Sequence, residues 1–137
     1  MAALKPGATI LDVGVDVGEN NPFENLLEQQ LSDTYRIVAV TLGNPAHLRA
    51  KYPKVRFVRA DGCALPFRDD AFDTMFSNAV IEHVGREANQ RRFTEEAVRV
   101  ARTGFITTPN FWYPIELHTT LPLVHYLPWG VRRYIFR

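Results

Sequence analysis

The sequence predicts a single α/β domain built around a doubly wound, mostly parallel sheet of five strands. Short apolar runs alternate with amphipathic helical segments between residues 8 and 108, and polar or glycine residues follow most of the runs. Strands that alternate with helices favour a parallel sheet with right-handed crossovers. At 137 residues, with 46% apolar and 23% charged residues, the chain has the size and composition of one globular domain.

The first half of the chain predicts two strand–helix units and a third strand. Residues 8–13 form an apolar run that ends at Gly14, which is typical of a strand buried on both faces. Pro22 suits the first turn of a helix. The apolar face of that helix would carry Phe23, Leu26, Leu27 and Leu31. A strand over 36–40, a short helix from Asn44-Pro45 to Tyr52 and a strand over 55–58 follow.

The second half predicts two more strands around a long helix. The strands cover residues 72–77 and 104–107, and the helix covers 87–101 with Phe93, Ala97 and Val100 facing inward. Residues 109–137 differ from the rest, because they combine four prolines with many aromatic residues. We therefore expect a core over 8–108 and an irregular cover segment over 109–137.

Composition and charge exclude several classes of protein. The net charge of +1 gives no overall field that would attract nucleic acid. Cys63 is the only cysteine, which excludes an internal disulfide and a cysteine-rich zinc site and suits a reducing compartment. We find no signal peptide and no apolar run long enough to span a bilayer, so a cytoplasmic location is expected.

Candidate ligand-binding residues follow the predicted strands. They are Gly14 to Gly18, Thr41, Asp61-Gly62 and Ser77-Asn78, after the first, second, third and fourth strands. In an open parallel sheet, ligands bind beyond the carboxyl ends of the strands, next to the point where strand order reverses. The spacing therefore predicts one ligand site along this edge.

Two linked motifs identify a family. They are Asp61-Gly-Cys-Ala-Leu-Pro-Phe67 and Phe72-Asp-Thr-Met-Phe-Ser-Asn-Ala-Val-Ile-Glu-His-Val84. With them, residues 8–110 resemble the class I S-adenosylmethionine-dependent methyltransferases of the type 11 group. The resemblance implies a Rossmann-like sheet of order 3-2-1-4-5 with helices on both faces, and S-adenosylmethionine as the cofactor. The complete family fold has two further strands in a hairpin, for which this chain shows no signal.

The same resemblance implies roles for several residues. Gly14 and Gly18 would let the backbone approach the cofactor, and Asp12 would orient their loop or bind the cofactor's ammonium group. Asp61 would accept a hydrogen bond from the adenine amino group, with backbone amides around Gly62 reading the ring. Asn78 would lie beneath the sulfonium.

Two positions depart from the family pattern. Asp16 stands where the family has the middle glycine of its loop, and Thr41 stands where an acidic residue normally binds both ribose hydroxyls. Asp16 would repel the pyrophosphate of a dinucleotide, but a carboxylate suits the cationic groups of S-adenosylmethionine. Both residues are therefore retained as candidates for cofactor binding, and a nicotinamide cofactor is disfavoured.

The acceptor side of the site is predicted after the fifth strand, where Asn110, Trp112 and Glu116 are candidates for substrate binding. His83 or His118 would act as general base if the acceptor is a hydroxyl, since an imidazole titrates near neutrality. Simpler alternatives are that Glu82-His83 lies at a helix start and that Phe111 and Trp112 cap the core. No metal is expected, because Ala79 replaces a carboxylate that a metal site in the Glu82-His83 turn would need.

The sequence thus predicts a methyltransferase that acts on a small molecule. The alternative is a catalytically inactive, methyltransferase-like scaffold or binding protein, favoured by Asp16, Thr41 and the missing hairpin. An uncovered edge at the fifth strand also predicts a homodimer or coverage by residues 109–137. The mixture of aromatic and basic residues over 127–137 is compatible with weak contact to a membrane surface.

Overall fold

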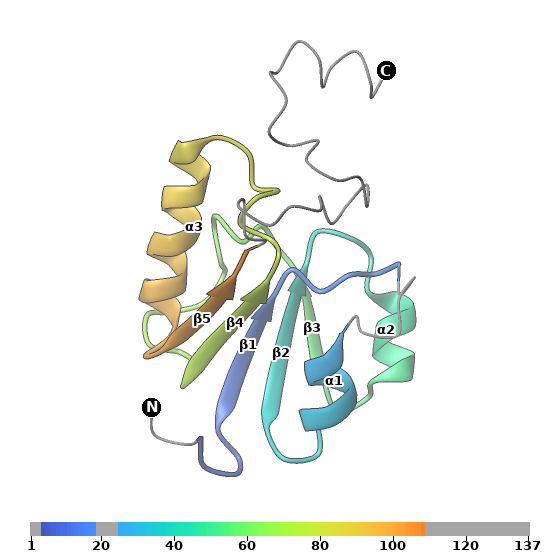
Figure 1. Cartoon of the computed structure of the whole chain (residues 1–137). Coiled ribbons are helices and arrows are strands. Elements are labelled where there is room, and N and C mark those ends of the chain that lie inside the picture. The colour runs from blue at the N-terminus through green and yellow to red at the C-terminus, as the bar shows by residue number, and fades with distance from the viewer. Residues whose placement is uncertain (1–3, 19–24, 109–137) are drawn as a thin grey trace, which may run out of the picture. The chain divides into compact units, whose positions relative to one another are not determined.

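The computed structural model describes residues 4–18 and 25–108, and these ranges contain five strands and three helices (Figure 1). In chain order, the elements are β1 (Thr9–Val13), α1 (Leu26–Leu31), β2 (Arg36–Thr41), α2 (Ala46–Lys51), β3 (Arg56–Arg59), β4 (Thr74–Asn78), α3 (Glu87–Val100) and β5 (Gly104–Thr107). Contacts divide the chain into two units, 1–107 and 108–137, and the fold below is that of the first. Within the described ranges, no helix is long and apolar enough to cross a membrane.

The strands form one parallel sheet of order β3-β2-β1-β4-β5, which confirms the predicted topology. The central strand β1 pairs with β2 on one side and β4 on the other, so Asp12 lies between Ala39 and Phe76. Strand order reverses between β1 and β4. In sheets of this kind, the carboxyl ends of these two strands border the ligand site.

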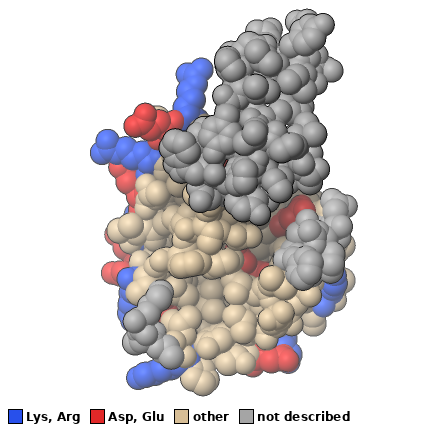
Figure 2. Space-filling view, viewed as in Figure 1, with Lys and Arg blue, Asp and Glu red and all other residues tan. Residues whose placement is uncertain are grey.

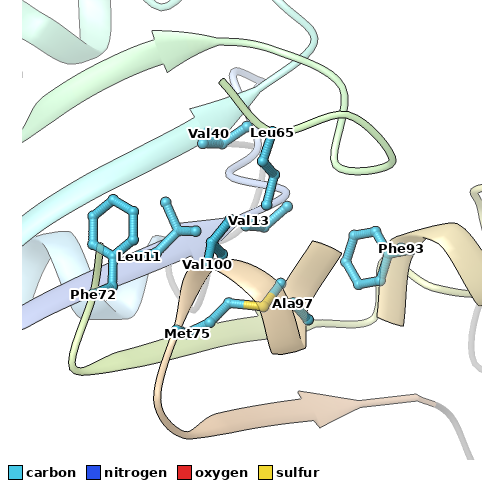
Figure 3. Close-up of a cluster of buried hydrophobic side chains, with 10 residues drawn as sticks. Leu11, Val13, Val40, Leu65, Phe72, Met75, Phe93, Ala97 and Val100 are labelled. Atoms are coloured by element: carbon cyan, nitrogen blue, oxygen red, sulfur yellow. The ribbon is translucent and has the colours of Figure 1, made fainter. Parts of the chain in front are cut away.

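Helices cover both faces of the sheet, as predicted (Figure 1). Side chains of successive strand residues point to opposite faces, and the two apolar clusters follow that alternation. Leu11 and Val13 of β1 pack with Phe93 and Val100 of α3 (Figure 3). Ile10 belongs to the opposite cluster. Its other members include Ile37, Ala39, Leu48 and Tyr52, with Leu27 and Leu31 of α1 packed against them.

The long helix is correctly predicted, with Phe93, Ala97 and Val100 buried, although it ends one residue earlier than expected. The Phe93 side chain extends from α3 to Gly62 in the loop after β3 and belongs to the cluster of Figure 3. The fifth strand has its predicted bounds, and the bounds of the other strands and of the second helix shift by two residues at most. Phe72 forms an isolated bridge with Ala101 and is not part of β4.

The prediction for the first helix is wrong in one respect. Within the described residues the helix begins at Leu26, and Leu26, expected on the apolar face, is 41% exposed. Glu28 is instead fully buried, with 0% of its surface exposed. Leu27, Glu28 and Leu31 are the residues that turn toward the sheet, so this face combines two leucines with one carboxylate. Pro22 and Phe23 lie outside the described residues.

The alternative that Glu82-His83 lies at a helix start is also wrong. These two residues belong to a turn, in which the His83 N–H donates to Val80 O at 2.8 Å. Helix α3 begins only at Glu87, with Arg86 at its N-cap position. Gly85, with φ of +95°, lies between the turn and the helix and lets the chain change direction there.

Candidate functional site

The segments after the strands meet at the carboxyl-end edge of the sheet. Gly14 N–H and Val15 N–H both donate to Val40 O, at 2.9 and 3.1 Å, which ties the β1 loop to the end of β2. Ala60 N–H donates to Thr41 O at 3.1 Å, which ties the β3 loop to the same strand. The loops that carry Gly14 and Asp61 are therefore both held at the end of β2, where Thr41 lies.

The loop after β1 owes its shape to Gly14. Its φ of +101° is unfavourable for any residue with a side chain. A Cβ at this position would also lie 2.1 Å from Cγ2 of Val80, in the segment after β4. Gly14 is therefore required by the protein's own packing. The loops after β1 and β4 touch because it has no side chain.

Asp16, in the same loop, forms a local turn. Its Oδ1 accepts a hydrogen bond from Gly18 N–H at 2.8 Å, and its backbone oxygen accepts one from the Asn25 side-chain amide at 3.0 Å. Asp16 is exposed and does not have the positive φ that only glycine adopts readily. An aspartate hence fits the position of the middle glycine without backbone strain, and its carboxylate is turned toward the backbone of its own loop.

The loop after β3 presents Asp61 to solvent. One carboxylate oxygen of Asp61 accepts a hydrogen bond from Cys63 N–H at 2.8 Å. Gly62 packs against the core, since a Cβ there would lie 2.6 Å from Cε2 of Phe93 and 3.1 Å from Cγ1 of Val13. Cys63 packs against the same cluster. Burial and the Asp61 carboxylate raise the pKa of the Cys63 thiol, so Cys63 is a packing residue and a poor nucleophile.

Two side chains of α3, Arg99 and Glu96, bind the rest of this loop, and we call this pair the clamp. It was not predicted from the sequence. The Arg99 guanidinium donates to Leu65 O at 3.0 Å and to Phe67 O at 2.7 Å, and it forms ion pairs with Glu96 and Asp69. Glu96 completes the clamp by accepting the Leu65 N–H at 2.6 Å. The signal that could have found it is the i, i+3 spacing of Glu96 and Arg99 on the side of α3 next to the loop.

Thr41 and Asn78 lie at the ends of their strands. Thr41 is buried, and its hydroxyl oxygen accepts a hydrogen bond from Gly43 N–H at 3.2 Å. Asn78 is exposed, and its side-chain oxygen accepts a hydrogen bond from the hydroxyl of Thr107 on β5. Ser77, one residue earlier, is fully buried and donates to Val13 O at 2.9 Å, which fixes the end of β4 against the end of β1.

Two carboxyl groups lie beneath the β1 loop. Asp12 is 8% exposed and Glu28 is fully buried. Burial and the neighbouring Glu28 raise the pKa of Asp12 well above its usual range, and burial raises the pKa of Glu28. Sequence reasoning found Asp12 but missed Glu28. The position of Glu28 in the sequence could have predicted its burial. It directly follows Leu27 and precedes Leu31 by three residues, which places it on the helix face that meets the sheet.

The remaining candidates fall into two groups. His83 is exposed in the turn after β4. Asn110, Trp112, Glu116 and His118 lie outside the described residues. Among the residues that are described, no group of three or more histidine, cysteine, aspartate or glutamate side chains is arranged to hold a metal ion.

Several methyltransferases are among the known proteins to which this chain is similar in sequence. A family model described as a methyltransferase domain matches residues 11–106. An uncharacterized methyltransferase of Mycolicibacterium vanbaalenii is 42% identical over 80 residues, which are 56% of this chain and 29% of that protein. A probable S-adenosylmethionine-dependent methyltransferase of Mycobacterium tuberculosis is 37% identical over 68 residues, which are 47% of this chain and 24% of that protein.

Solved structures are similar in fold. A SAM-dependent methyltransferase from Aquifex aeolicus superposes with a TM-score of 0.62 and 20% identity, over 98% of this chain and 72% of that chain. The YcgJ protein of Bacillus subtilis gives a TM-score of 0.61 and 18% identity, over 85% of this chain and 49% of that chain. At these identities, the likeness concerns the fold alone. The chain spans less than a third of the length of either curated relative.

Proposed function

This chain belongs to the methyltransferase domain family, and from that premise we propose that it transfers a methyl group from S-adenosylmethionine to a small molecule. One observation carries the proposal. The loops after β1, β3 and β4, which hold the candidate cofactor residues, lie together at the sheet edge where strand order reverses. This is the edge at which doubly wound sheets bind their ligands.

The residues present fit S-adenosylmethionine. Asp12 and Glu28 place buried negative charge beneath the β1 loop, and neither oxygen of Glu28 has a hydrogen-bond partner among the described residues. Such a site favours a cation, and the methionine end of the cofactor carries an ammonium and a sulfonium. Asp61 has a carboxylate oxygen beyond the one bonded to Cys63, which suits an adenine amino group.

Each loop would then contribute one part of the cofactor site. Gly14, Asp16 and Gly18 would line the methionine part, Asp61 and Gly62 the adenine, and Asn78 the region of the sulfonium. Thr41 has only a hydroxyl to offer the ribose, so we expect one hydrogen bond there where an acidic residue would form two.

Little acid–base chemistry is required of the protein itself. When bound, the cofactor supplies a methyl group that its sulfonium already activates. The protein must orient the acceptor in line with that methyl group, and such positioning supplies much of the rate. If the acceptor is a hydroxyl, His83 or His118 would remove its proton. Asn110, Trp112 and Glu116 would bind the acceptor, because they follow the strand next to Asn78.

The inactive scaffold is the second candidate. Thr41 still favours it, because the usual bidentate contact to the ribose is missing. Asp16 no longer does, since its position accepts an aspartate without strain.

Calorimetric titration with S-adenosylmethionine and S-adenosylhomocysteine tests the proposal. We expect micromolar binding that Asp61→Ala abolishes. Asp61→Asn keeps an oxygen for the Cys63 N–H but turns an amide toward the adenine amino group, so it should weaken binding while preserving the turn. Asp70→Asn is the matched control, because Asp70 is exposed and its φ of +51° is one that asparagine tolerates.

Absence of binding at millimolar cofactor would refute the enzyme and favour the scaffold. Equal binding by wild type, Asp61→Ala and Asp70→Asn would place the cofactor elsewhere. Binding that is followed by methyl transfer in a screen of small-molecule acceptors would identify the substrate class.

A homodimer through β5 is a further part of the proposal. Among the described strands, β5 is an edge strand, and Phe105 on it is 54% exposed and stacks on Phe76 of β4. Exposed edges of this kind favour pairing with another chain. The face shown in Figure 2 has few charged side chains across its centre, and most of them lie toward its margins. Light scattering at micromolar concentration should give the mass of a dimer, and a monomer would refute this part.

A further inference from the structure

Helix α1 turns a carboxylate toward the sheet, and the proposed reaction does not by itself explain why. Glu28 is fully buried, between Leu27 and Leu31, which pack on the cluster formed by Ile10 and Ile37. Neither of its carboxylate oxygens has a hydrogen-bond partner among the described residues. An isolated, ionised carboxylate in such surroundings would cost several kcal/mol. Its charge must therefore be compensated or neutralised.

Asp12 lies in the same layer. Residues two apart on a strand share a face, so Asp12 points to the side of Ile10, the side that α1 covers (Figure 1). Leu11 and Val13 point to the opposite side, toward α3 (Figure 3). Asp12 and Glu28 are thus two buried carboxyl groups in the layer between β1 and α1, and each acts on the pKa of the other.

No ion pair joins either carboxylate to a basic side chain within the described part of the chain. Within residues 4–18 and 25–108, the charged group that acts on Asp12 is Glu28, and the larger effect on the pKa of both residues is burial. Two ionised carboxylates this close repel each other strongly in a buried layer. A single proton removes both the repulsion and the lack of a hydrogen-bond partner, because the hydroxyl of one carboxyl group can donate to the carboxylate of the other.

We propose that Glu28 is a positioning residue for Asp12: the two carboxyl groups share one proton under α1, and together they carry one negative charge beside the loop that follows β1. Glu28 thereby holds Asp12 in the orientation that its cofactor role requires. The shared proton is a property of the chain alone. Only its consequence for the cofactor rests on the proposed function.

That consequence is a coupling between cofactor binding and proton release. A cation next to the pair favours its fully ionised form, so binding should displace part of the shared proton. Binding should therefore strengthen as the pH rises through the range in which the pair titrates. The same pair predicts the opposite trend for the free protein, since a raised pKa stabilises the folded state at low pH and this contribution disappears as the pair ionises.

The free protein provides the first test. Near neutral pH, infrared spectra should show the carbonyl band of a buried protonated carboxyl group. Asp12→Asn and Glu28→Gln should each remove that band, because each replaces one member of the pair with an amide that donates the hydrogen bond instead. Over the pH range in which this band disappears, the midpoint of thermal unfolding should fall more with rising pH in wild type than in either variant. Glu95→Gln, which removes an exposed carboxylate from α3, is the matched control and should behave as wild type.

Calorimetry provides the second test. Each single variant keeps one negative charge, and we expect it to weaken S-adenosylmethionine binding by roughly threefold or less. The double variant Asp12→Asn/Glu28→Gln keeps the shape but loses the charge, and should weaken binding roughly 10- to 100-fold. Repeating the titration in buffers of different ionisation enthalpy should show proton release on binding to wild type and not to Glu28→Gln.

The possible outcomes separate this inference from the proposed function. If wild type fails to bind the cofactor, the proposed function fails, and the infrared band and unfolding midpoints still decide whether the proton is shared. If the band is absent, or if both single variants bind as poorly as the double variant, the shared proton is refuted. If the double variant binds as well as the single ones, the pair is not the counter-charge of the cofactor.

Discussion

The first prediction concerns the loss of stability that Gly14→Ala should cause. The substitution forces alanine to adopt a φ of +101°, and it places a Cβ 2.1 Å from Cγ2 of Val80. Rotation of the Val80 side chain about its Cα–Cβ bond would leave its Cβ 3.2 Å from the new atom, so the contact stays tight after the methyl group has moved. The backbone conformation costs about 1–3 kcal/mol and the overpacking about 1–3 kcal/mol. Unfolding free energy should fall by about 2–6 kcal/mol in total.

Urea denaturation of the free protein measures this cost, and two further variants divide it. Gly7 has a φ of +81°, and a Cβ added there would have nothing within 4 Å, so Gly7→Ala reports the backbone cost alone. Val80→Ala removes the clashing methyl groups, at a cost of about 1 kcal/mol for a half-buried valine. Combined with Gly14→Ala, it should recover about 1–3 kcal/mol. Strict additivity of the two changes, or a cost of Gly14→Ala below about 1 kcal/mol, would refute the assigned contact.

Three other changes test how the loops and the sheet are held. Phe93→Ala should lower the unfolding free energy, measured by urea denaturation, by about 3–5 kcal/mol. The reason is that the Phe93 side chain of α3 is fully buried and packs against Gly62. A loss under about 1 kcal/mol would contradict that packing. Arg99→Lys cannot reproduce the forked contacts to two carbonyl groups, so amide exchange at Leu65 should accelerate while that of β1 stays unchanged; unchanged exchange at Leu65 would dismiss the clamp. Asp73 accepts hydrogen bonds from Thr9 N–H and Oγ1 at 2.9 and 2.8 Å, which lower its pKa. Asp73 should therefore stabilise the folded state at neutral pH, and this stabilisation should be lost below about pH 4. The thermal unfolding midpoint of Asp73→Asn should then approach that of wild type in acid. A difference between the two midpoints that does not change with pH would exclude the linkage.

The architecture could be predicted because it depends on periodicity. Runs such as 8–13 and 36–40 are apolar on both faces, as buried parallel strands must be, and the spacing of Phe93, Ala97 and Val100 is helical. The topology came from the resemblance to a family. Boundaries were less exact, because a strand ends where its hydrogen-bonded partner ends, and the partner is not visible in the local sequence.

The candidate site could be predicted only for residues that stand at positions of a known motif. Asp61 and Gly14 stand at motif positions, so their places at the edge were expected. Glu28 and Arg99 act through residues that are distant along the chain, and their roles depend on which layer each side chain enters. Leu26 illustrates the same limit. A helix as short as α1 fits several apolar stripes, and contact with the sheet selects the one that includes Glu28.

Asp16, where the β1 loop departs from the family pattern, adds a carboxylate to those already buried beneath the loop. A loop rich in glycine suits any ligand that needs close approach, but this loop is fixed by the Asp16 turn and by the contact of Gly14 with Val80. Beneath it lie Asp12 and Glu28, and within residues 4–18 and 25–108 no basic side chain forms an ion pair with either. A phosphate placed here would meet carboxylates from both sides, whereas a cation would relieve their repulsion. The carboxylates around this loop therefore narrow the choice of ligand to one with a cationic end.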